Sequence, residues 1–236
     1  MKAPIILAVD TSDFEVAKSW VKATHESVSV YKLGLEFFLN FGSDGVRAIQ
    51  DVSGSAIFLD LKLHDIPHTV AGAANAISHL NPKFLTIHAS GGSAMIKAAV
   101  AAVPQIDVTA VTILTSLSEE DLFQIGFANS ALESAVALAK MSVDSGAKAI
   151  VCSPLEVAAI RSAVGEATTL ITPGVRPLSD VGKDDQSRTM TPEEAISAGA
   201  SYVVIGRPIT NEWSNGVEAM KDRAAQIASS LLSRSK

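Results

Sequence analysis

The sequence predicts a single (β/α)8 barrel that spans residues 1–236 as one catalytic domain. Short apolar runs rich in β-branched residues recur at fairly even intervals, and segments with helical periodicity lie between them. The chain of 236 residues is also close to the length of about 250 residues that is typical of this fold. No linker or break in composition indicates a second domain.

Eight apolar runs are expected to form the strands of the barrel, in the order 5–10, 30–35, 57–63, 84–90, 107–114, 149–154, 169–175 and 202–208. Ala-rich segments between them, such as 131–146 and 153–165, predict helices, and Gly146 fits a helix C-cap. An open doubly wound sheet is the alternative fold. It is disfavoured because the stretch after the first strand, AVDTSDFE, contains no glycine and so lacks a dinucleotide-binding fingerprint.

Composition excludes several classes of function. The chain is 47% hydrophobic with a net charge of −6, which predicts a large core and disfavours a general nucleic-acid surface. The first apolar run stops at Asp10, and no stretch approaches the ~20 apolar residues of a membrane span, so we expect no membrane association. Cys152 is the only cysteine, which excludes an intramolecular disulfide, predicts a small buried side chain and fits a cytoplasmic location.

Polar side chains gather where the predicted strands end, and this is where barrel enzymes place their active sites. In chain order they are Asp10, Lys32, Asp60, Lys62, His88, Thr115, Arg176 and Arg207. The first halves of the same strands are almost uncharged. This asymmetry favours a site at the carboxyl end of the barrel.

Side chains alternate across a strand, so Asp60 and Lys62 are expected to share the inner face while Leu59, Leu61 and Leu63 pack outward. The same alternation turns Asp10 and Lys32 inward, so that all four charges converge above the barrel core. The following stretch HDIPHTV is expected to be a proline-directed loop that carries Asp65 and Thr69 away from this site. A purely structural ion-pair cluster is the alternative interpretation.

The composition of this charge array limits its chemistry. The sequence has no GxSxG nucleophile elbow and no HExxH metal motif. A lysine between carboxylates stays protonated, which suits Lys62 to donate a proton to a developing carbanion. The fixed carboxylate of Asp60 would repel a substrate carboxylate more than a transition state that is losing CO₂. Decarboxylation with protonation by Lys62 is therefore the predicted reaction.

A second site signal follows the last two strands, where barrel enzymes commonly bind phosphate. The motifs are TPGVRP at 172–177 and VIGRPIT at 204–210, in which Gly206 allows close backbone approach and Arg207 supplies a bidentate charge. The polar stretch 178–192 between them fits either a lid over a bound ligand or an ordinary exposed loop.

Together these motifs resemble the orotidine 5′-phosphate decarboxylase family over essentially the whole chain. LDLKLHDIPHTV matches the family's D-x-K-x-x-D signature with its following I-P-x-T. PGVRP and IGRPIT match its two phosphate-side motifs, and AVD and YKLGLE fit its first two strands. The resemblance implies decarboxylation of orotidine 5′-phosphate without a cofactor.

The resemblance also assigns roles to the charged residues. It implies that Lys62 protonates C6 of the pyrimidine, that Asp60 lies next to the departing carboxylate, and that Lys32 bridges Asp60 and a ribose hydroxyl. Asp10 would bind the ribose. Asp65 and Thr69 would reach the neighbouring subunit's site, which makes the expected enzyme a homodimer.

The remaining implied contacts concern the pyrimidine and the phosphate. Thr115, with Ser116 beside it, matches the position that contacts the pyrimidine. The residues implied to close on the phosphate are Arg176, Gln186, Gly206 and Arg207, with Gln186 coming from the lid. His64 and His88 lie near the signature, and we expect both to be structural.

Two rival functions stay open from the sequence. Metal-dependent relatives such as 3-keto-gulonate-6-phosphate decarboxylase and hexulose-phosphate synthase share D-x-K-x-x-D but bring an acid near the end of the second strand to bind magnesium. Here Lys32 occupies that stretch and Glu36 is the nearby acid. The second rival is a non-catalytic barrel that binds a nucleotide or sugar phosphate. Such a protein would have no use for the buried charges of Asp60, Lys62 and Asp65.

Overall fold

The computed structural model describes residues 2–177 and 190–233. Gln186, and the predicted lid apart from its last residues, lie outside the described residues. Among the described residues, no helix is both long enough and apolar enough to pass through a membrane.

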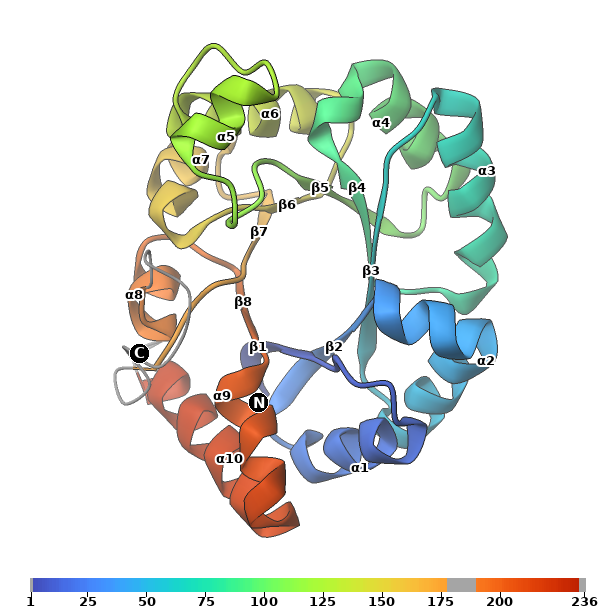
Figure 1. The fold of residues 1–236 in the computed structure, drawn as a ribbon, viewed down its shortest axis with the longest axis vertical. Helices are drawn as coiled ribbons and strands as arrows, with labels where there is room; N and C mark the ends of the chain where they lie inside the picture. Colours follow the sequence, from blue (N-terminus) through green and yellow to red (C-terminus); the bar gives the residue numbers. More distant parts are fainter. Residues whose placement is uncertain (1, 178–189, 234–236) are drawn as a thin grey trace.

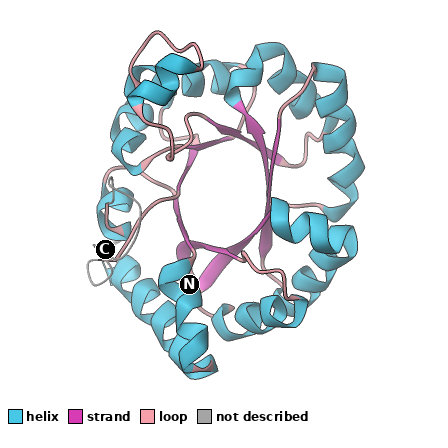
Figure 2. Ribbon diagram, in the orientation of Figure 1, coloured by secondary structure: helices cyan, strands magenta, loops and turns pink. Residues whose placement is uncertain are grey.

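Parallel strands close into a barrel in which neighbours in sequence are neighbours in space, and β8 pairs with β1 (Figures 1 and 2). This confirms the predicted (β/α)8 fold. The strands are β1 (Ala3–Ala8), β2 (Val28–Gly34), β3 (Ala56–Leu63), β4 (Phe84–His88), β5 (Asp107–Val111), β6 (Ala149–Val151), β7 (Thr169–Thr172) and β8 (Tyr202–Ile205).

Helices surround the barrel on its outer side (Figure 2). Within the part of the chain that the structure describes, they are α1 (Phe14–Thr24), α2 (Leu35–Ser53), α3 (Pro67–Ile77), α4 (Gly92–Ala102), α5 (Glu119–Gln124), α6 (Ala131–Asp144), α7 (Val157–Val164), α8 (Pro192–Ser197), α9 (Arg207–Thr210) and α10 (Val217–Ser233). Short 3₁₀ turns occupy Ser78–Leu80, Ala89–Gly91, Pro154–Glu156 and Asn211–Asn215.

Local sequence explains where these helices begin and end. Asp13 accepts hydrogen bonds from the first turn of α1, and Ser130 forms a capping box with Glu133 at the start of α6. After α6 the chain reaches Gly146, whose φ of 97° is the left-handed conformation that glycine tolerates best. The predicted helix end at Gly146 is therefore correct.

The core has two layers. The larger layer lies between the strands and the helices, and the smaller one fills the barrel itself. The fully buried members of the inner cluster include Phe58 and Phe84, whose rings meet edge to face at 5.7 Å. This packed interior forms a floor, so that polar groups further along the strands lie at the mouth of the barrel rather than in a pore.

Two boundaries differ from the prediction. Several strands end earlier than their apolar runs: β1 ends at Ala8, so that Asp10 follows it rather than ending it, and β5 ends at Val111 rather than at residue 114. The stretch predicted as a proline-directed loop is mostly helix, because Pro67 occupies the first turn of α3. Proline has no N–H to donate and a φ suited to a helix start, so Pro67 begins α3 and the predicted proline-directed loop is wrong from this residue on.

Candidate active site

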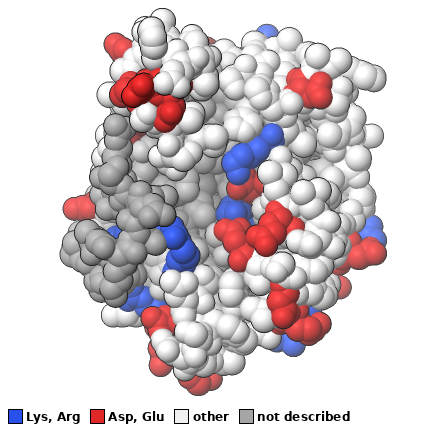
Figure 3. Space-filling view, in the orientation of Figure 1, with Lys and Arg blue, Asp and Glu red and all other residues white. Residues whose placement is uncertain are grey.

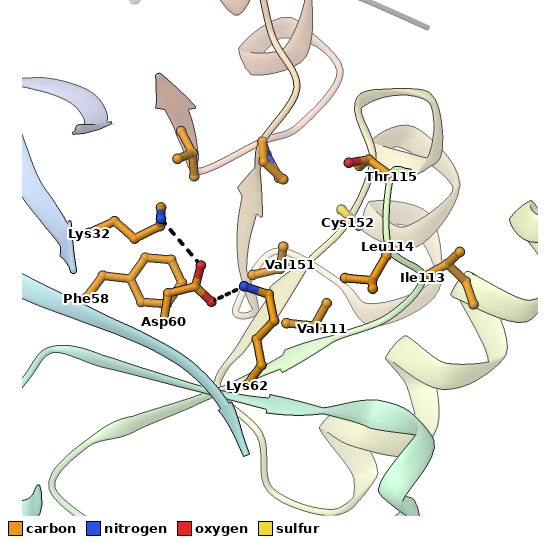
Figure 4. A pocket seen from close by; sticks show the side chains of 12 residues that line it. Lys32, Phe58, Asp60, Lys62, Val111, Ile113, Leu114, Thr115, Val151 and Cys152 are labelled. Carbon is orange, nitrogen blue, oxygen red and sulfur yellow. Dashed lines mark hydrogen bonds and ion pairs between the residues drawn. The ribbon is translucent and has the colours of Figure 1, made fainter. Parts of the chain in front are cut away.

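Three charged side chains from neighbouring strands meet at the barrel mouth. Asp60 of β3 lies between two lysines, with its Oδ1 2.8 Å from Nζ of Lys62 and its Oδ2 3.6 Å from Nζ of Lys32 (Figure 4). Lys32 of β2 also donates to Oδ1 of Asp10 at 3.1 Å. These side chains therefore form one chain of alternating charge, which we call the charge array, in the order Asp10, Lys32, Asp60 and Lys62. In Figure 3 basic and acidic side chains meet beside a hollow over the barrel.

Asp60 is the most deeply buried carboxylate of this array, with 12% of its side chain exposed. Burial alone would raise the pKa of Asp60, but the positive charges of Lys32 and Lys62, with hydrogen bonds from Lys62 and Thr86, outweigh it and lower the pKa. Asp60 is therefore an anion that the surrounding cations hold in place.

The array needs space, which a glycine provides. Gly34 ends β2, and a Cβ built at this position would lie 3.3 Å from Nζ of Lys32 and 3.5 Å from Oδ1 of Asp10. A side chain there would crowd the ion pair between Lys32 and Asp10. The glycine in YKLGLE thus has a packing reason that the sequence alone did not reveal.

Strand β3 is irregular at the array. Its pairing with β4 runs regularly through Leu59 and Leu85 but resumes only at Leu63 and Ile87. Within this irregularity Lys62 has a φ of 48°, which a non-glycine residue rarely adopts. Asp60 and Lys62 do lie together, as predicted, but the simple alternation of a regular strand is not what brings them together.

A cavity of about 200 Å³ opens beside the charge array (Figure 4). Its lining residues are Lys32, Phe58, Asp60, Lys62, Val111, Ile113, Leu114, Thr115, Val151, Cys152, Pro173 and Val204. Charged groups come from β2 and β3, whereas the opposite wall is apolar. A ligand in this cavity would have one side on an ammonium and a carboxylate and the other side on hydrocarbon, which suits a planar, partly charged molecule.

The predicted site residues outside the charge array do not all line the cavity. Thr115 lines the cavity, whereas its exposed neighbour Ser116 does not. Asp65 is exposed and accepts a hydrogen bond from its neighbour Ile66 N at 2.6 Å, and Thr69 is exposed in the first turn of α3. The structure of one chain therefore does not bring Asp65 or Thr69 into the cavity.

The residues expected near a phosphate lie on the β7 and β8 side of the barrel. Gly206 precedes the short helix α9, and Arg207 is exposed at its start. Arg176 is buried, and its Nη1 donates to the carbonyl of Val175 at 3.1 Å. None of these three residues lines the cavity beside the charge array.

Three other side chains near the site are expected to have structural roles, namely His64, His88 and Cys152. The rings of His64 and His88 lie 5.4 Å apart, and burial, followed by the nearby His64 and Lys62, lowers the pKa of His88. Cys152 is 1% exposed, and burial raises its pKa to about 12, which describes an inert buried thiol although it lines the cavity. Among the described residues, no group of three or more His, Cys, Asp or Glu side chains is arranged to hold a metal ion.

Sequence reasoning missed one polar residue of the site. Thr86, in the middle of β4, is fully buried and donates to Oδ1 of Asp60 at 3.0 Å. A threonine inside an apolar strand carries no charge signal, so only its position opposite Asp60 reveals it. Sequence analysis also did not identify the apolar wall of the cavity, because apolar side chains in strands are equally consistent with the hydrophobic core.

Comparisons with known proteins agree on one family. Residues 3–222 match the model of the family described as orotidine 5′-phosphate decarboxylase / HUMPS. The chain is 49% identical over 219 residues to an orotidine 5′-phosphate decarboxylase from Thermobifida fusca, covering 93% of this chain and 94% of that protein. It is 47% identical over 214 residues to one from Wolbachia pipientis, covering 90% and 93%.

A solved structure gives the same result in three dimensions. The crystal structure of orotidine 5′-phosphate decarboxylase from Lactobacillus acidophilus superposes with a TM-score of 0.80 at 34% identity, covering 96% of this chain and 99% of that one. An uncharacterised conserved protein from Geobacillus kaustophilus has a TM-score of 0.79 at 26% identity.

Proposed function

The chain belongs to the orotidine 5′-phosphate decarboxylase / HUMPS family, and we propose that it converts orotidine 5′-phosphate to UMP and CO₂ in pyrimidine biosynthesis. The observation that carries this proposal is the contact of 2.8 Å between Asp60 and Lys62 beside a cavity with an apolar wall. A carboxylate and an ammonium on one side of this cavity support the proposal.

The charge array supports a direct mechanism. With the pyrimidine in the cavity, its C6 carboxylate would lie next to Asp60, whose negative charge disfavours the bound carboxylate more than the transition state. The bond from C6 to the carboxyl carbon breaks, CO₂ leaves, and the electron pair stays on C6. The ammonium of Lys62 then donates a proton to C6, and the neutral amine regains one from water.

The other charges would position the substrate. Lys32 contacts both Asp10 and Asp60, so it can hold the carboxylate of Asp60 in place and still reach a ribose hydroxyl. Asp10 is 59% exposed on its side chain and can accept hydrogen bonds from the ribose. Thr115, with Ser116 beside it, would contact the pyrimidine, and Arg176, Gln186, Gly206 and Arg207 the phosphate.

We further propose a cytoplasmic homodimer in which Asp65 and Thr69 complete the partner's site. Both are exposed in one chain, and they lie close in sequence to the exposed apolar side chain of Ile66, which is 66% accessible. A surface that combines an exposed carboxylate, a hydroxyl and an exposed isoleucine is suited to contact a second copy.

No metal or cofactor has a part in this proposal. In the metal-dependent members of the wider family an acid near the end of the second strand would help bind magnesium. Here Nζ of Lys32 lies between Asp10 and Asp60, and a cation at that place competes with a bound metal. Glu36, the alternative acid, is exposed in the first turn of α2.

The test is turnover of orotidine 5′-phosphate by purified protein in excess chelator, with UMP and CO₂ measured as products. We expect full activity. Activity that disappears with chelator and returns with Mg²⁺ would favour a metal-dependent relative. Tight binding of UMP without any turnover would favour a non-catalytic nucleotide-binding barrel.

A further inference from the structure

We propose that Thr86 is a positioning residue whose single hydroxyl oxygen sets the relative geometry of Asp60 and Lys62. The inference rests on the proposed function for the importance of that geometry, but the contacts themselves do not depend on it. Thr86 lies in the middle of β4, on the strand next to the charge array, and is 0% exposed.

The hydroxyl of Thr86 accepts one hydrogen bond and donates another. Its Oγ1 accepts a hydrogen bond from the backbone N–H of Lys62 at 2.8 Å. Its own hydrogen can be donated to Oδ1 of Asp60 at 3.0 Å, which is closer than the alternative acceptor, the carbonyl of Leu59 at 3.5 Å. A bond to an ionised oxygen is also the stronger one. One atom therefore connects the main chain of Lys62 to the side chain of Asp60.

These contacts explain how the irregularity in β3 is tolerated. Between the pairs Leu59–Leu85 and Leu63–Ile87, β3 advances further along the chain than β4 does, so extra backbone must be accommodated. The φ of 48° at Lys62 accommodates the extra residues of β3. Its N–H, which the bulge removes from the ladder, needs another acceptor, and Thr86 provides one.

The bulge determines where the lysine points. With the N–H of Lys62 fixed on Thr86, the side chain folds back so that Nζ reaches the same oxygen, Oδ1 of Asp60, to which Thr86 donates. Without the hydroxyl, Oδ1 would lose one of its two donors and the bulge would lose its acceptor. Both catalytic groups would then be free to shift.

The neighbouring strand offers a matched control. Thr109 of β5 pairs in register with Thr86, is equally buried, and donates only to the carbonyl of Asp107 at 2.9 Å. Its hydroxyl is hydrogen-bonded to neither Asp60 nor Lys62. Thr109→Val therefore makes the same chemical change in the same layer of the barrel without touching the charge array.

The experiment compares Thr86→Val, Thr86→Ser and Thr109→Val by kcat, by affinity for UMP and by urea unfolding. We expect Thr86→Val to lower kcat about tenfold to a hundredfold while UMP affinity changes by less than about threefold, because the lost contacts orient reacting groups. Thr86→Ser, which keeps the hydroxyl, should recover most of kcat, and Thr109→Val should keep it. A folded Thr86→Val with kcat like that of Thr109→Val, or equal losses in Thr86→Val and Thr86→Ser, would overturn the proposal.

A second measurement needs no substrate, and its first part needs only the wild-type protein. Amide hydrogen exchange of the wild-type protein should show the N–H of Lys62 protected like the ladder amides, and Thr86→Val should remove that protection. Fast exchange at Lys62 in the wild type would overturn the inference even if Thr86→Val does not fold. If the wild type fails to decarboxylate orotidine 5′-phosphate, the proposed function fails, whereas protection at Lys62 still tests the role of Thr86.

Discussion

The side chains of Lys62 and Asp60 lie 2.8 Å apart although both belong to strand β3. A regular strand would separate side chains of alternate residues along its length, and the positive φ of Lys62 closes that gap. The ammonium of Lys62 and the carboxylate of Asp60 are therefore adjacent because of one local backbone conformation. The contact lies entirely within one chain.

The buried carboxylate makes stability depend on pH in a defined direction. The folded-state pKa of Asp60 is lowered from its ordinary value of 3.8, so its contribution to the free energy of unfolding is complete above about pH 5 and is lost as pH falls below about 4. Asp60→Asn leaves two lysines facing a neutral amide and should lower stability at pH 7 by about 1–3 kcal/mol.

Urea unfolding of both proteins at several pH values checks this prediction. The stability difference between wild type and Asp60→Asn should be constant from pH 7 to about pH 5 and shrink below that. Asp107→Asn is the control, because its partner Lys148 is 3.5 Å away and 55% exposed. A difference that grows on acidification would contradict the lowered pKa.

The thiol of Cys152 should be inert although it lines the cavity. Burial raises its pKa to about 12, so almost no thiolate exists at pH 8. We expect iodoacetamide to leave the native protein unlabelled, as measured by intact mass, and to label it once after unfolding in urea. Rapid labelling of the native protein would show that the cavity wall opens far more than the structure indicates.

Mixing two inactive variants tests the shared site. If Asp65 completes the partner's site, a mixed dimer of Lys62→Ala and Asp65→Asn contains one intact site and one doubly defective site. Random reassociation of equal amounts should then restore about a quarter of wild-type activity. If Asp65 acts within its own subunit, every site keeps one defect, and the mixture should stay as inactive as its components.

Phosphate recognition can be separated from catalysis at Arg207. This residue is exposed at the start of α9, where a cation can meet a dianion. Arg207→Ala should lower kcat/KM for orotidine 5′-phosphate by about a hundredfold but barely change it for orotidine, which has no phosphate to bind. Arg47→Ala, which removes an exposed arginine of α2, is the matched control. Equal losses on both substrates would assign Arg207 a structural role.

The barrel and the charge array could be predicted because both leave a periodic signal. Strands buried on both faces appear as apolar runs, and a charge at the end of such a run, like Asp60 or Lys32, has few explanations other than a site. The positions of Asp60, Lys32 and Asp10 relative to one another follow from the order of neighbouring strands in a closed barrel, whereas that of Lys62 depends on the bulge in β3.

Features without such a signal were missed. The bulge at Lys62 could not be predicted, because a lysine in the sequence does not indicate a positive φ. Thr86 resembles any β-branched strand residue until its neighbour across the ladder is known. Pro67 was misjudged since proline both ends and begins helices, and only the apolar positions further along α3 distinguish the two.

The replacement of Lys62 by alanine tests the central claim most directly. The measurement is UMP formation from orotidine 5′-phosphate in excess chelator, together with UMP affinity, for wild type, Lys62→Ala and the control Lys148→Ala, which removes an ion-paired lysine next to the start of β6. We predict turnover by wild type and Lys148→Ala, and none by Lys62→Ala, which should still bind UMP. Turnover by Lys62→Ala at a rate near that of wild type would contradict the assignment of Lys62 as the proton donor.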